Sequence, residues 1–286
     1  LATVLIVMEI ALACAVLCNA CSIIVQRLQL TRMNSGLDES ALAVLRVNGF
    51  DADKPGDLNA RMLAGLRIIP GMQSVSVVSG VPFGDQPINA GITLNHDGQR
   101  ARSVAGVVGF YNNGPGSFEA LGLKLVQGRA PQTDDFQPVT TFVPKDAQVI
   151  VSRTLAEYLW PGQEALGKEF WTGSYHCRVR GVVAHLARAS AGEGGTGTIE
   201  WSVFTPAQPG FNLAGTYLLR ADPRDLPRVL RDAKAAVATI APDVVLDQEA
   251  SHTIGDLRPR YFHGDLAMAG MLVGLLLALF LITALG

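Results

Sequence analysis

Charged residues are scarce in this chain of 286 residues. They make up 17% of the sequence, whereas an ordinary soluble domain carries about a quarter. The two signs nearly balance, at a formal net charge of −2, and no basic block runs along the chain. Because nucleic-acid binding needs clustered lysines and arginines to neutralise phosphates, we expect no nucleic-acid partner.

Cysteine is also rare. Cys14, Cys18 and Cys21 lie in an apolar run at the start, and Cys177 is alone in the middle of the chain. No disulfide can therefore form within the middle segment, and cysteine usage does not decide the compartment. The first three cysteines share one helical face by their spacing. Packing of small residues between membrane helices is the favoured interpretation of this face, and a metal or lipid role is the alternative.

Patterns that carry catalysis or metal binding are missing as well. No HExxH spacing marks a metal site, and no GxSxG or SxxK marks a nucleophile. Residues 162–169, GQEALGKE, match the first seven positions of a phosphate-binding loop, but Glu169 stands where Ser or Thr would bind Mg²⁺. We expect a turn between a helix and a strand there, and a solvated loop at Asp134-Asp135. The sequence predicts no catalytic, cofactor-binding or metal-binding residue. Its five histidines are His96, His176, His185, His252 and His263.

Long apolar runs occupy both ends of the chain. Residues 1–25 hold one charged residue, Glu9, and residues 266–286 hold none. Each run can cross a hydrocarbon core of about 30 Å at about 1.5 Å per helical residue, so we predict transmembrane helices at 1–25 and 266–286. A cleaved signal peptide is the alternative for the first run, which however lacks a basic start and exceeds the usual apolar length of about 7–15 residues. The chain starts at Leu1 and stops within an apolar run, so we interpret it as an excerpt of a longer membrane protein.

Two features of these runs have open interpretations. Glu9 either faces protein within the membrane or lies at the membrane edge, because a carboxylate in a span is costly. Gly270 and Gly274 form a GxxxG pattern, which either permits close helix packing or arises by chance in a glycine-rich run.

The middle segment, residues 26–265, holds all but one of the charged residues and has two strand–helix–strand units. The first has a strand at 41–50, a helix capped by Asp57 and ended by Pro70-Gly71, and a strand at 74–79. The second has a strand at 216–221, a helix starting at Asp222-Pro223 or Asp225-Leu226, and a strand at 244–246. The apolar stripes of the two helices are Leu58, Met62, Leu63, Leu66 and Ile69, and Leu226, Val229, Leu230, Ala233, Val237 and Ile240.

The stretch between these units, residues 88–213, is richer in strands. A short helix is expected at 152–160, and the glycine-rich residues 191–198 are expected to form a flexible loop. Two similar units around a different central stretch suggest an α+β domain with another domain inserted into it. The predicted central strands are 104–110, 149–151, 168–171, 179–183 and 201–204.

Four stretches along this segment resemble the periplasmic core of MacB/FtsX-type ABC transporter permeases. The most specific is VIVSRTLAEYLWPGQEALGKEF at 149–170, which accounts for the apparent phosphate-binding loop. Ser117 stands where the family usually has Tyr, which with the glycine-rich loop leaves the subfamily open. The other matching stretches are LRIIPGM at 66–72 running to Val78 and Val81-Pro82-Phe83, SFEALGL at 117–123 with Gln127-Gly128-Arg129, and Arg180-Gly181-Val182-Val183.

The resemblance implies a non-enzymatic permease subunit with four transmembrane helices, of which this chain holds the first and second. Residues 26–265 would be the periplasmic core, with a porter-like part at about 37–87 and 214–250 and a strand-rich, sabre-like insertion at about 88–213. Residues 266–286 would begin the FtsX-like permease region. The implied fold is an α+β extracytoplasmic domain between two membrane helices.

The resemblance also implies partners and a place in the cell. Such permeases work as dimers, with themselves or a similar permease, in the inner membrane of bacteria, driven by a separate or fused cytoplasmic ATPase. A periplasmic adaptor and membrane lipids are further implied partners, and no cofactor is implied. The periplasmic domain moves as ATP is hydrolysed, for efflux or extraction of a peptide, drug or lipoprotein-like substrate.

Two observations keep other interpretations open. Arg27, Arg32, Arg258 and Arg260 flank the middle segment, and the positive-inside rule would hold it in the cytoplasm, although that rule weakens for loops beyond about 60 residues. The order span, domain, span is also typical of membrane sensor receptors. Two further apolar spans after Gly286 would indicate a permease, and a charged linker with a kinase region would indicate a sensor.

Overall fold

A computed structural model describes most of the middle of the chain and parts of both ends. The described residues are 14–15, 18–25, 28–29, 31–50, 55–84, 88–95, 105–190, 196–210, 212–264, 267–268, 270–271 and 273–274.

The chain divides into two compact units, which we describe separately. The first joins residues 1–33 to 258–286, and the second is residues 34–257. In the first unit, the described residues before Arg32 and beyond Phe262 are helical. None of the helices formed by described residues is both long and apolar enough to span a membrane. The predicted spans 1–25 and 266–286 lie largely outside the described residues, and Glu9 lies wholly outside them.

Several described residues in both segments of the first unit are exposed to solvent. Cys14, Cys18 and Cys21 are exposed, as are the helical Gly270 and Gly274. The guanidinium of Arg258 donates from Nη1 to the carbonyls of Thr31 and Met33, at 3.0 and 2.9 Å. Arg258 therefore links the two segments of the first unit, 1–33 and 258–286.

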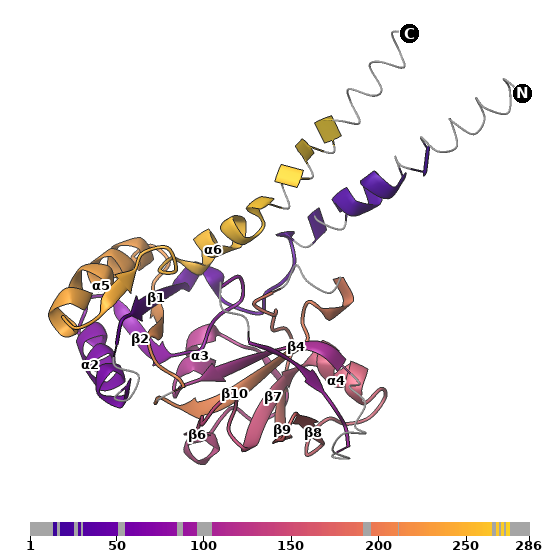
Figure 1. Ribbon diagram of the computed structural model, residues 1–286, viewed down its shortest axis with the longest axis horizontal. Helices are drawn as coiled ribbons and strands as arrows, with labels where there is room; N and C mark the ends of the chain where they lie inside the picture. Colours follow the sequence, from indigo (N-terminus) through magenta and orange to yellow (C-terminus); the bar gives the residue numbers. More distant parts are fainter. Residues whose placement is uncertain are drawn as a thin grey trace, which may run out of the picture. The chain divides into compact units, whose positions relative to one another are not determined.

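A four-stranded sheet forms one part of the second unit (Figure 1), with the order β12-β1-β11-β2. All three pairings between neighbouring strands are antiparallel. As a result β1 and β2 are parallel with β11 between them, and β11 and β12 are parallel with β1 between them. In each predicted strand–helix–strand unit, a strand of the other unit therefore lies between the two strands. This is the ferredoxin-like arrangement. The strands are β1 (Leu42–Asn48), β2 (Met72–Val77), β11 (Thr216–Ala221) and β12 (Val245–Asp247).

Two helices, α2 (Pro55–Arg67) and α5 (Leu226–Ile240), cover one face of this sheet. Their apolar stripes are the predicted ones, and they pack on alternate residues of the strands because successive strand side chains point to opposite faces. The prediction of Asp57 as the helix cap was wrong: α2 begins at Pro55, since proline is accepted in a first turn that needs no N–H, and Asp57 pairs with Arg61 at 3.5 Å. The centre of this core includes Leu45, Met62, Leu66, Val77, Tyr217, Leu219, Val229 and Ala233.

An eight-stranded mixed sheet forms the rest of the second unit. Its main path runs β3-β4-β10-β7-β9-β5, with β6 paired to β10 and β8 to β9. Strand pairs β10–β4 and β7–β9 are parallel. All its strands lie between Asn89 and Gln208: β3 (Asn89–Ile92), β4 (Ala105–Asn113), β5 (Leu125–Gly128), β6 (Gln137–Pro138), β7 (Asp146–Ser152), β8 (Glu169–Thr172), β9 (Tyr175–Val183) and β10 (Ser202–Gln208).

Short helices complete the second unit. Helix α4 (Arg153–Leu159) is capped by the Ser152 hydroxyl, which accepts from the N–H of Leu155, so the predicted helix at 152–160 is confirmed. Within the predicted loop at 191–198, residues 191–195 lie outside the described ones, and η4 (Thr196–Thr198) is a 3₁₀ helix rather than loop. The remaining elements are η1 (Glu39–Ala41), α3 (Ser117–Leu121), η3 (Thr133–Asp135) and α6 (Ile254–Tyr261).

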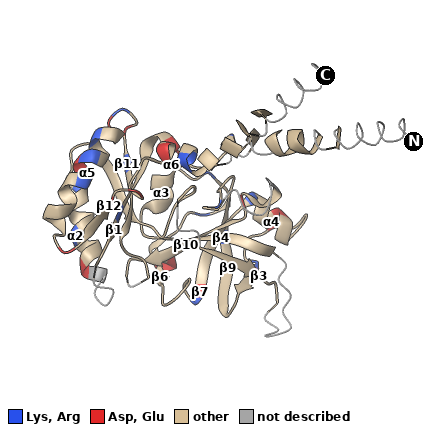
Figure 2. Ribbon diagram, turned by 45° about the horizontal axis from the view of Figure 1, so that its top comes forward, with Lys and Arg blue, Asp and Glu red and all other residues tan. Residues whose placement is uncertain are grey.

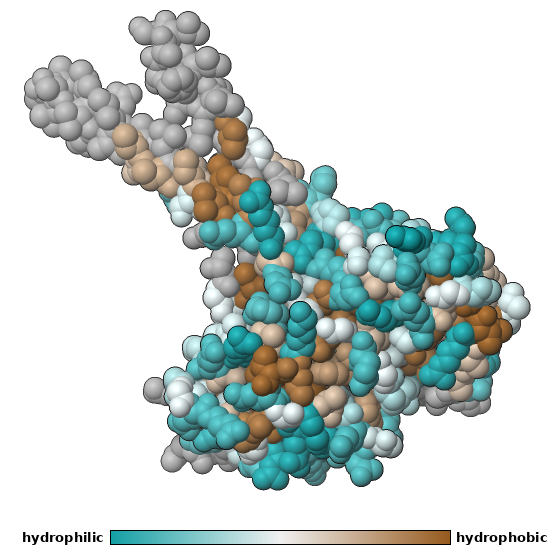
Figure 3. Space-filling view, turned by 180° about the vertical axis from the view of Figure 1, so that it is seen from behind, coloured by the Kyte–Doolittle hydropathy of each residue, from teal (hydrophilic) through white to brown (hydrophobic). Residues whose placement is uncertain are grey.

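Charges of both signs are spread over the second unit (Figure 2). On α5, Arg228 lies between Asp225 and Asp232, at 3.5 and 3.3 Å. Hydrophilic residues cover much of the face seen in Figure 3, with smaller apolar areas among them, as is normal for a folded domain.

Candidate functional site at the entry segment

The first residues of the second unit, 34–41, connect both sheets, and we call them the entry segment. The Ser35 carbonyl accepts from the N–H of Ala187 at 2.9 Å, and the N–H of Asp38 donates to the Leu121 carbonyl at 3.2 Å. Ala187 follows β9 of the large sheet, and Leu121 ends α3. The segment leads directly into β1 of the small sheet, so it is bonded to the loop after β9 and to α3, and it is covalently continuous with the small sheet.

Gly36 fits this passage because it has no side chain. Its φ is +84°, in the left-handed region that favours glycine. A Cβ placed there would collide with the backbone carbonyl of His185. The close approach between the entry segment and the loop after β9 therefore depends on this glycine.

Arg220 of β11 holds the entry segment from the small sheet. Its Nη2 lies 2.6 Å from Oδ2 of Asp38, and its Nη1 donates to the carbonyl of Ala120 in α3 at 2.7 Å. The Arg220 side chain is 25% exposed and that of Asp38 42% exposed. Hydrogen bonds between ionised groups are about twice as strong as neutral ones, so this one guanidinium fastens the small sheet to both the entry segment and α3.

The outgoing chain is attached to the same strand that the entry segment leads into. The N–H of Val44 donates to the His252 carbonyl at 2.8 Å, and the N–H of Arg46 donates to Oγ of Ser251 at 2.9 Å. Thr253 forms a β-bridge with Ala43, and its hydroxyl accepts from the N–H of Asp256 in the first turn of α6. Strand β1 is thus the point where both ends of the second unit join its fold.

A hollow of about 380 Å³ opens beside the entry segment. His185 lines it, with Nδ1 2.9 Å from Oε1 of Glu200. Ser35 donates from its hydroxyl to the Glu39 side chain nearby. The lining residues are Asn34, Gly36, Leu37, Asp38, Gly122, Lys124, Ala184 and His185.

Of the residues that the sequence singled out, His185 and Gly122, which belongs to the matching stretch 117–123, line this hollow. Residues 162–168 form the predicted turn between α4 and β8, which begins at Glu169, and Nζ of Lys168 donates to Oε1 of Gln163 at 2.8 Å. His176 lies 3.3 Å from Asp146 and 3.4 Å from Glu169. Within the described ranges, no three His, Cys, Asp or Glu side chains gather as metal ligands. His96 lies outside those ranges.

Sequence reasoning gave no role to Gly36, Asp38 or Arg220, although all three fasten the entry segment. Gly36, Asp38 and Arg220 belong to no motif, and Asp38 and Arg220 are separated by 182 positions. The only local signal was Gly36, since glycine is the default where the backbone needs a positive φ.

Comparison with known proteins matches residues 10–248 to the MacB-like periplasmic core domain. The chain belongs to this family. It contains a MacB-like periplasmic domain of an ABC-type permease family. No curated protein matches the chain.

Three solved structures are similar at low identity. The periplasmic region of MacB from Actinobacillus actinomycetemcomitans is 16% identical, with a TM-score of 0.46 over 74% of this chain and 90% of that one. The extracellular domain of the noncanonic ABC-type transporter YknZ from Gram-positive bacteria is 15% identical, with a TM-score of 0.45 over 72% and 100%. A permease domain from Porphyromonas gingivalis is 14% identical, with a TM-score of 0.45 over 75% and 90%.

In this MacB-like periplasmic core domain, the matching stretch Gln127-Gly128-Arg129 is structural. Gly128 has φ +77°, and a Cβ there would collide with the carbonyl of Arg180. Arg129 makes two hydrogen bonds to Asp135, at 2.5 and 2.9 Å. Asp135 is only 6% exposed, so the expectation of a solvated loop at Asp134-Asp135 was wrong for Asp135.

The ionisation of Asp135 follows from these contacts. Burial disfavours the carboxylate, but the hydrogen bonds from Arg129 and from the N–H of Gln132 outweigh burial and lower its pKa below the usual value of 3.8. Its charge therefore belongs to the fold of the large sheet, not to a reactive site.

Proposed function

We propose that this chain is the permease or mechanotransmission part of an ABC-type exporter. In this proposal the apolar runs 1–25 and 266–286 are membrane helices, and the domain between them lies outside the inner membrane of a bacterium. ATP hydrolysis occurs in a cytoplasmic ATPase, separate or fused, and this chain has no catalytic residue of its own. The transported molecule is a peptide, a drug or a lipoprotein-like substrate.

The observation that carries the proposal is the way both ends join strand β1. The entry segment continues into β1, and the outgoing residues 251–253 are bonded along β1. A displacement of either end would therefore act on a central strand of the small sheet. Packed cores and interfaces switch between discrete arrangements and do not deform continuously, so such a displacement would move the small sheet as a body.

The entry segment supplies the second step of the proposed coupling. It is bonded to the loop after β9 and to α3, as well as to Arg220. A movement of the small sheet would therefore be passed to the large sheet through Asp38, Arg220 and the close contact at Gly36. The hollow beside the segment leaves room for its side chains to shift.

The division into two parts is also a proposal. We assign a porter-like part to about 37–87 and 214–250 and a sabre-like insertion to about 88–213. The positions of the strands support it, because the four strands of the small sheet fall in the first two ranges and the strands of the large sheet fall in the third. We further propose that the chain pairs with itself or with a similar permease, and that a periplasmic adaptor is a candidate partner.

Affinity purification tests the proposed function. The full-length tagged protein is extracted from native membranes in mild detergent, and its partners are identified by mass spectrometry. We expect an ABC-type ATPase in stoichiometric amount, on the same polypeptide or a separate one. Recovery of a response regulator or a kinase region without an ATPase would overturn the proposal and indicate a membrane sensor receptor.

A further inference from the structure

Helix α4 lies at the outside of the second unit, where it packs on β7 and β9 of the large sheet (Figure 1). One side of the helix is buried, and the other is open to solvent. The open residues are Arg153, Glu157 and Tyr158, and β5 adds Val126, which is 41% exposed. We call these four residues the α4 face.

The two charged residues of the α4 face have no partner in the described part of the chain. Neither the Arg153 guanidinium nor the Glu157 carboxylate forms an ion pair or a hydrogen bond with any described residue. The two residues are four positions apart, but a base followed by an acid is the less favourable order for pairing within a helix. Both charges therefore remain available to another chain.

A hollow of about 400 Å³ opens beside these two charges. Arg153 and Glu157 are the only charged residues among the described ones that line it, and Trp160, which is 7% exposed, lines it as well. Tyr158 is 50% exposed, and its ring packs on that of Trp201 with the centroids 4.2 Å apart. Tryptophan, tyrosine and arginine are the side chains that most often dominate the binding energy of protein interfaces.

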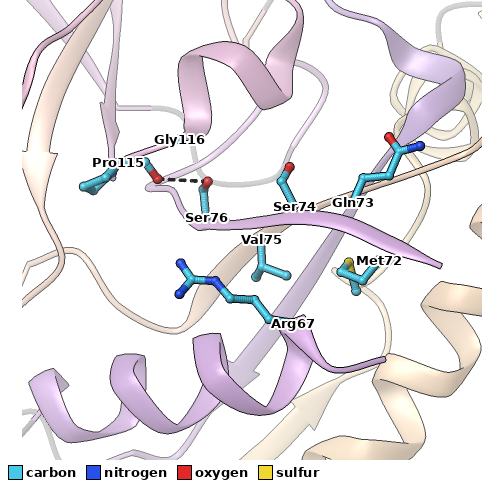
Figure 4. Close-up of a pocket in the computed structure, with 8 residues that line it drawn as sticks. All are labelled: Arg67, Met72, Gln73, Ser74, Val75, Ser76, Pro115 and Gly116. Carbon is cyan, nitrogen blue, oxygen red and sulfur yellow. Dashed lines mark hydrogen bonds between the residues drawn. The ribbon is translucent and has the colours of Figure 1, made fainter. Parts of the chain in front are cut away.

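The hollow at β2 of the small sheet differs from this one in its room and in its charge (Figure 4). Val75 and Ser76 are 3% and 2% exposed, so that edge has no space for another chain. Figure 4 shows Arg67 of α2 on the side of β2 away from the hydroxyls of Ser74 and Ser76. No Asp or Glu is among the described residues that line that hollow. A surface with one sign of charge cannot pair with itself, whereas the α4 face carries both signs.

We propose that the α4 face is an interface between two copies of this chain, with the two α4 helices antiparallel about a twofold axis. In a twofold interface, residue i of one copy contacts residue j of the other, and j contacts i. Arg153 of each copy then pairs with Glu157 of the other copy. Residues four apart on a helix lie about 5–6 Å from each other, so one crossing of the two helices forms both ion pairs. Val126 and Tyr158 add apolar contact area, and the hollow takes up side chains of the facing copy.

The charges favour a second copy over another protein. One positive and one negative residue leave the α4 face without net charge, so it attracts neither an acidic nor a basic partner. An antiparallel second copy satisfies both charges at once. The interface rests on the proposed function, in which the chain pairs with itself, and it names the surface that this pairing uses.

A disulfide trap between two copies tests this geometry. Two differently tagged full chains are produced together, one with Arg153→Cys and the other with Glu157→Cys, and the exposed cysteines of both are replaced by Ala. One Arg153–Glu157 ion pair remains to hold the interface. Under mild oxidation in native membranes, we expect at least tenfold more disulfide between unlike copies than between like copies. The same trap at Arg231 and Ala235, which are exposed and four apart on α5, is the control and should give no disulfide.

An exchange of the two charges is the second test. Arg153→Glu alone places acids opposite acids and should separate the copies, whereas Arg153→Glu combined with Glu157→Arg restores both ion pairs. Spin labels at Gln163→Cys, an exposed residue that lines the hollow, report the separation by double electron–electron resonance in nanodiscs that hold two copies. We expect a defined distance in the protein with both native charges, its loss in the single variant and its return in the double variant.

Several results would overturn the proposal. These are a trap no better than the control on α5, disulfides chiefly between like copies, or a double variant that fails to restore the distance. A disulfide between the Arg153→Cys chain and a different protein would also overturn it, because the α4 face would then belong to that partner. None of these results bears on the recovery of an ATPase, and copies that pair through another surface would leave the proposed pairing intact. Failure here is therefore distinct from failure of the proposed function.

Discussion

Arg220 and Asp38 join the small sheet to the entry segment, with Nη2 and Oδ2 2.6 Å apart. The same guanidinium reaches the Ala120 carbonyl at 2.7 Å, so one side chain serves three parts of the fold. Exposed ion pairs contribute little, at about 0–1 kcal/mol. We expect the Arg220–Asp38 pair, which is half-buried and has an added hydrogen bond to a carbonyl, to contribute more than this to the free energy of unfolding. Hydrogen bonds to charged groups contribute about 1.5–3 kcal/mol each.

Replacing Arg220 by Met should loosen this junction while keeping an apolar stem. We expect the free energy of unfolding to fall by about 1–2 kcal/mol, because both charged hydrogen bonds are lost and the exposure of Asp38 softens the effect. Thermal unfolding of the full chain in nanodiscs measures the change. Arg231→Met on α5 is the control, since the Arg231 side chain is 73% exposed. Equal stability of the two variants would show that the Arg220 contacts contribute nothing.

Gly36→Ala should destabilise the protein more than an ordinary glycine substitution. The new Cβ meets both a positive φ and the His185 carbonyl. Gly162→Ala is the matched control, because Gly162 also has a positive φ, +69°, with open space around it. A non-glycine residue in the left-handed region costs about 1–3 kcal/mol. We expect the free energy of unfolding to fall by about this much in the control and by clearly more in Gly36→Ala. Thermal unfolding measures both changes. Equal losses would mean that the entry segment can move away from the loop after β9.

Much of the small sheet could be predicted from the sequence because its elements are locally periodic. The stripe from Leu226 to Ile240 repeats at helical spacing, and all its members except Ile240 are buried. The strand at 216–221 was predicted to the residue. What the sequence could not supply is the pairing of β1 with β11, in which Leu42 lies opposite Arg220. Two strands so far apart in the chain carry no local signal of their register.

The large sheet and the junction were harder to predict for a related reason. Strands β3, β5 and β6 were missed, since they are short and all their residues except Ile92 are half-exposed or exposed. The partners of Asp38 and Asp135 come from tertiary packing, and an acid next to a turn is typical of solvent-exposed loops. What distinguishes these two acids from such residues is the arginine partner of each, 182 positions away for Asp38 and 6 for Asp135, and the burial of Asp135.

The stability given by Asp135 should depend on pH. Because its pKa is lowered in the folded state, its contribution is present above the ordinary value of 3.8 and is lost as the pH falls through the folded value. Asp135→Asn should therefore unfold at a lower temperature than the unaltered protein at pH 7, and the difference should shrink below pH 3.8. Asp134→Asn, which changes an exposed neighbour, is the control and should show little difference at either pH. If the difference in unfolding temperature between Asp135→Asn and the unaltered protein were as large at low pH as at pH 7, the Asp135 charge would not be the source of the stability.

Cys177 should be unreactive in the folded protein. It is fully buried in β9, and burial raises the pKa of its thiol from 9.0 to about 12. The thiolate is the reactive form, so at pH 8 roughly a thousandfold less of it is present than for an ordinary thiol. In a variant with Cys14, Cys18 and Cys21 replaced by Ala, we expect maleimide to label Cys177 only at the rate at which the large sheet opens. Labelling should therefore accelerate with denaturant, as it does for a group that reacts only from an open state. Labelling of the native protein as fast as a free thiol would mean that β9 is not closed off at Cys177 by its neighbours β7 and β8, and the packing of the large sheet would have to be revised.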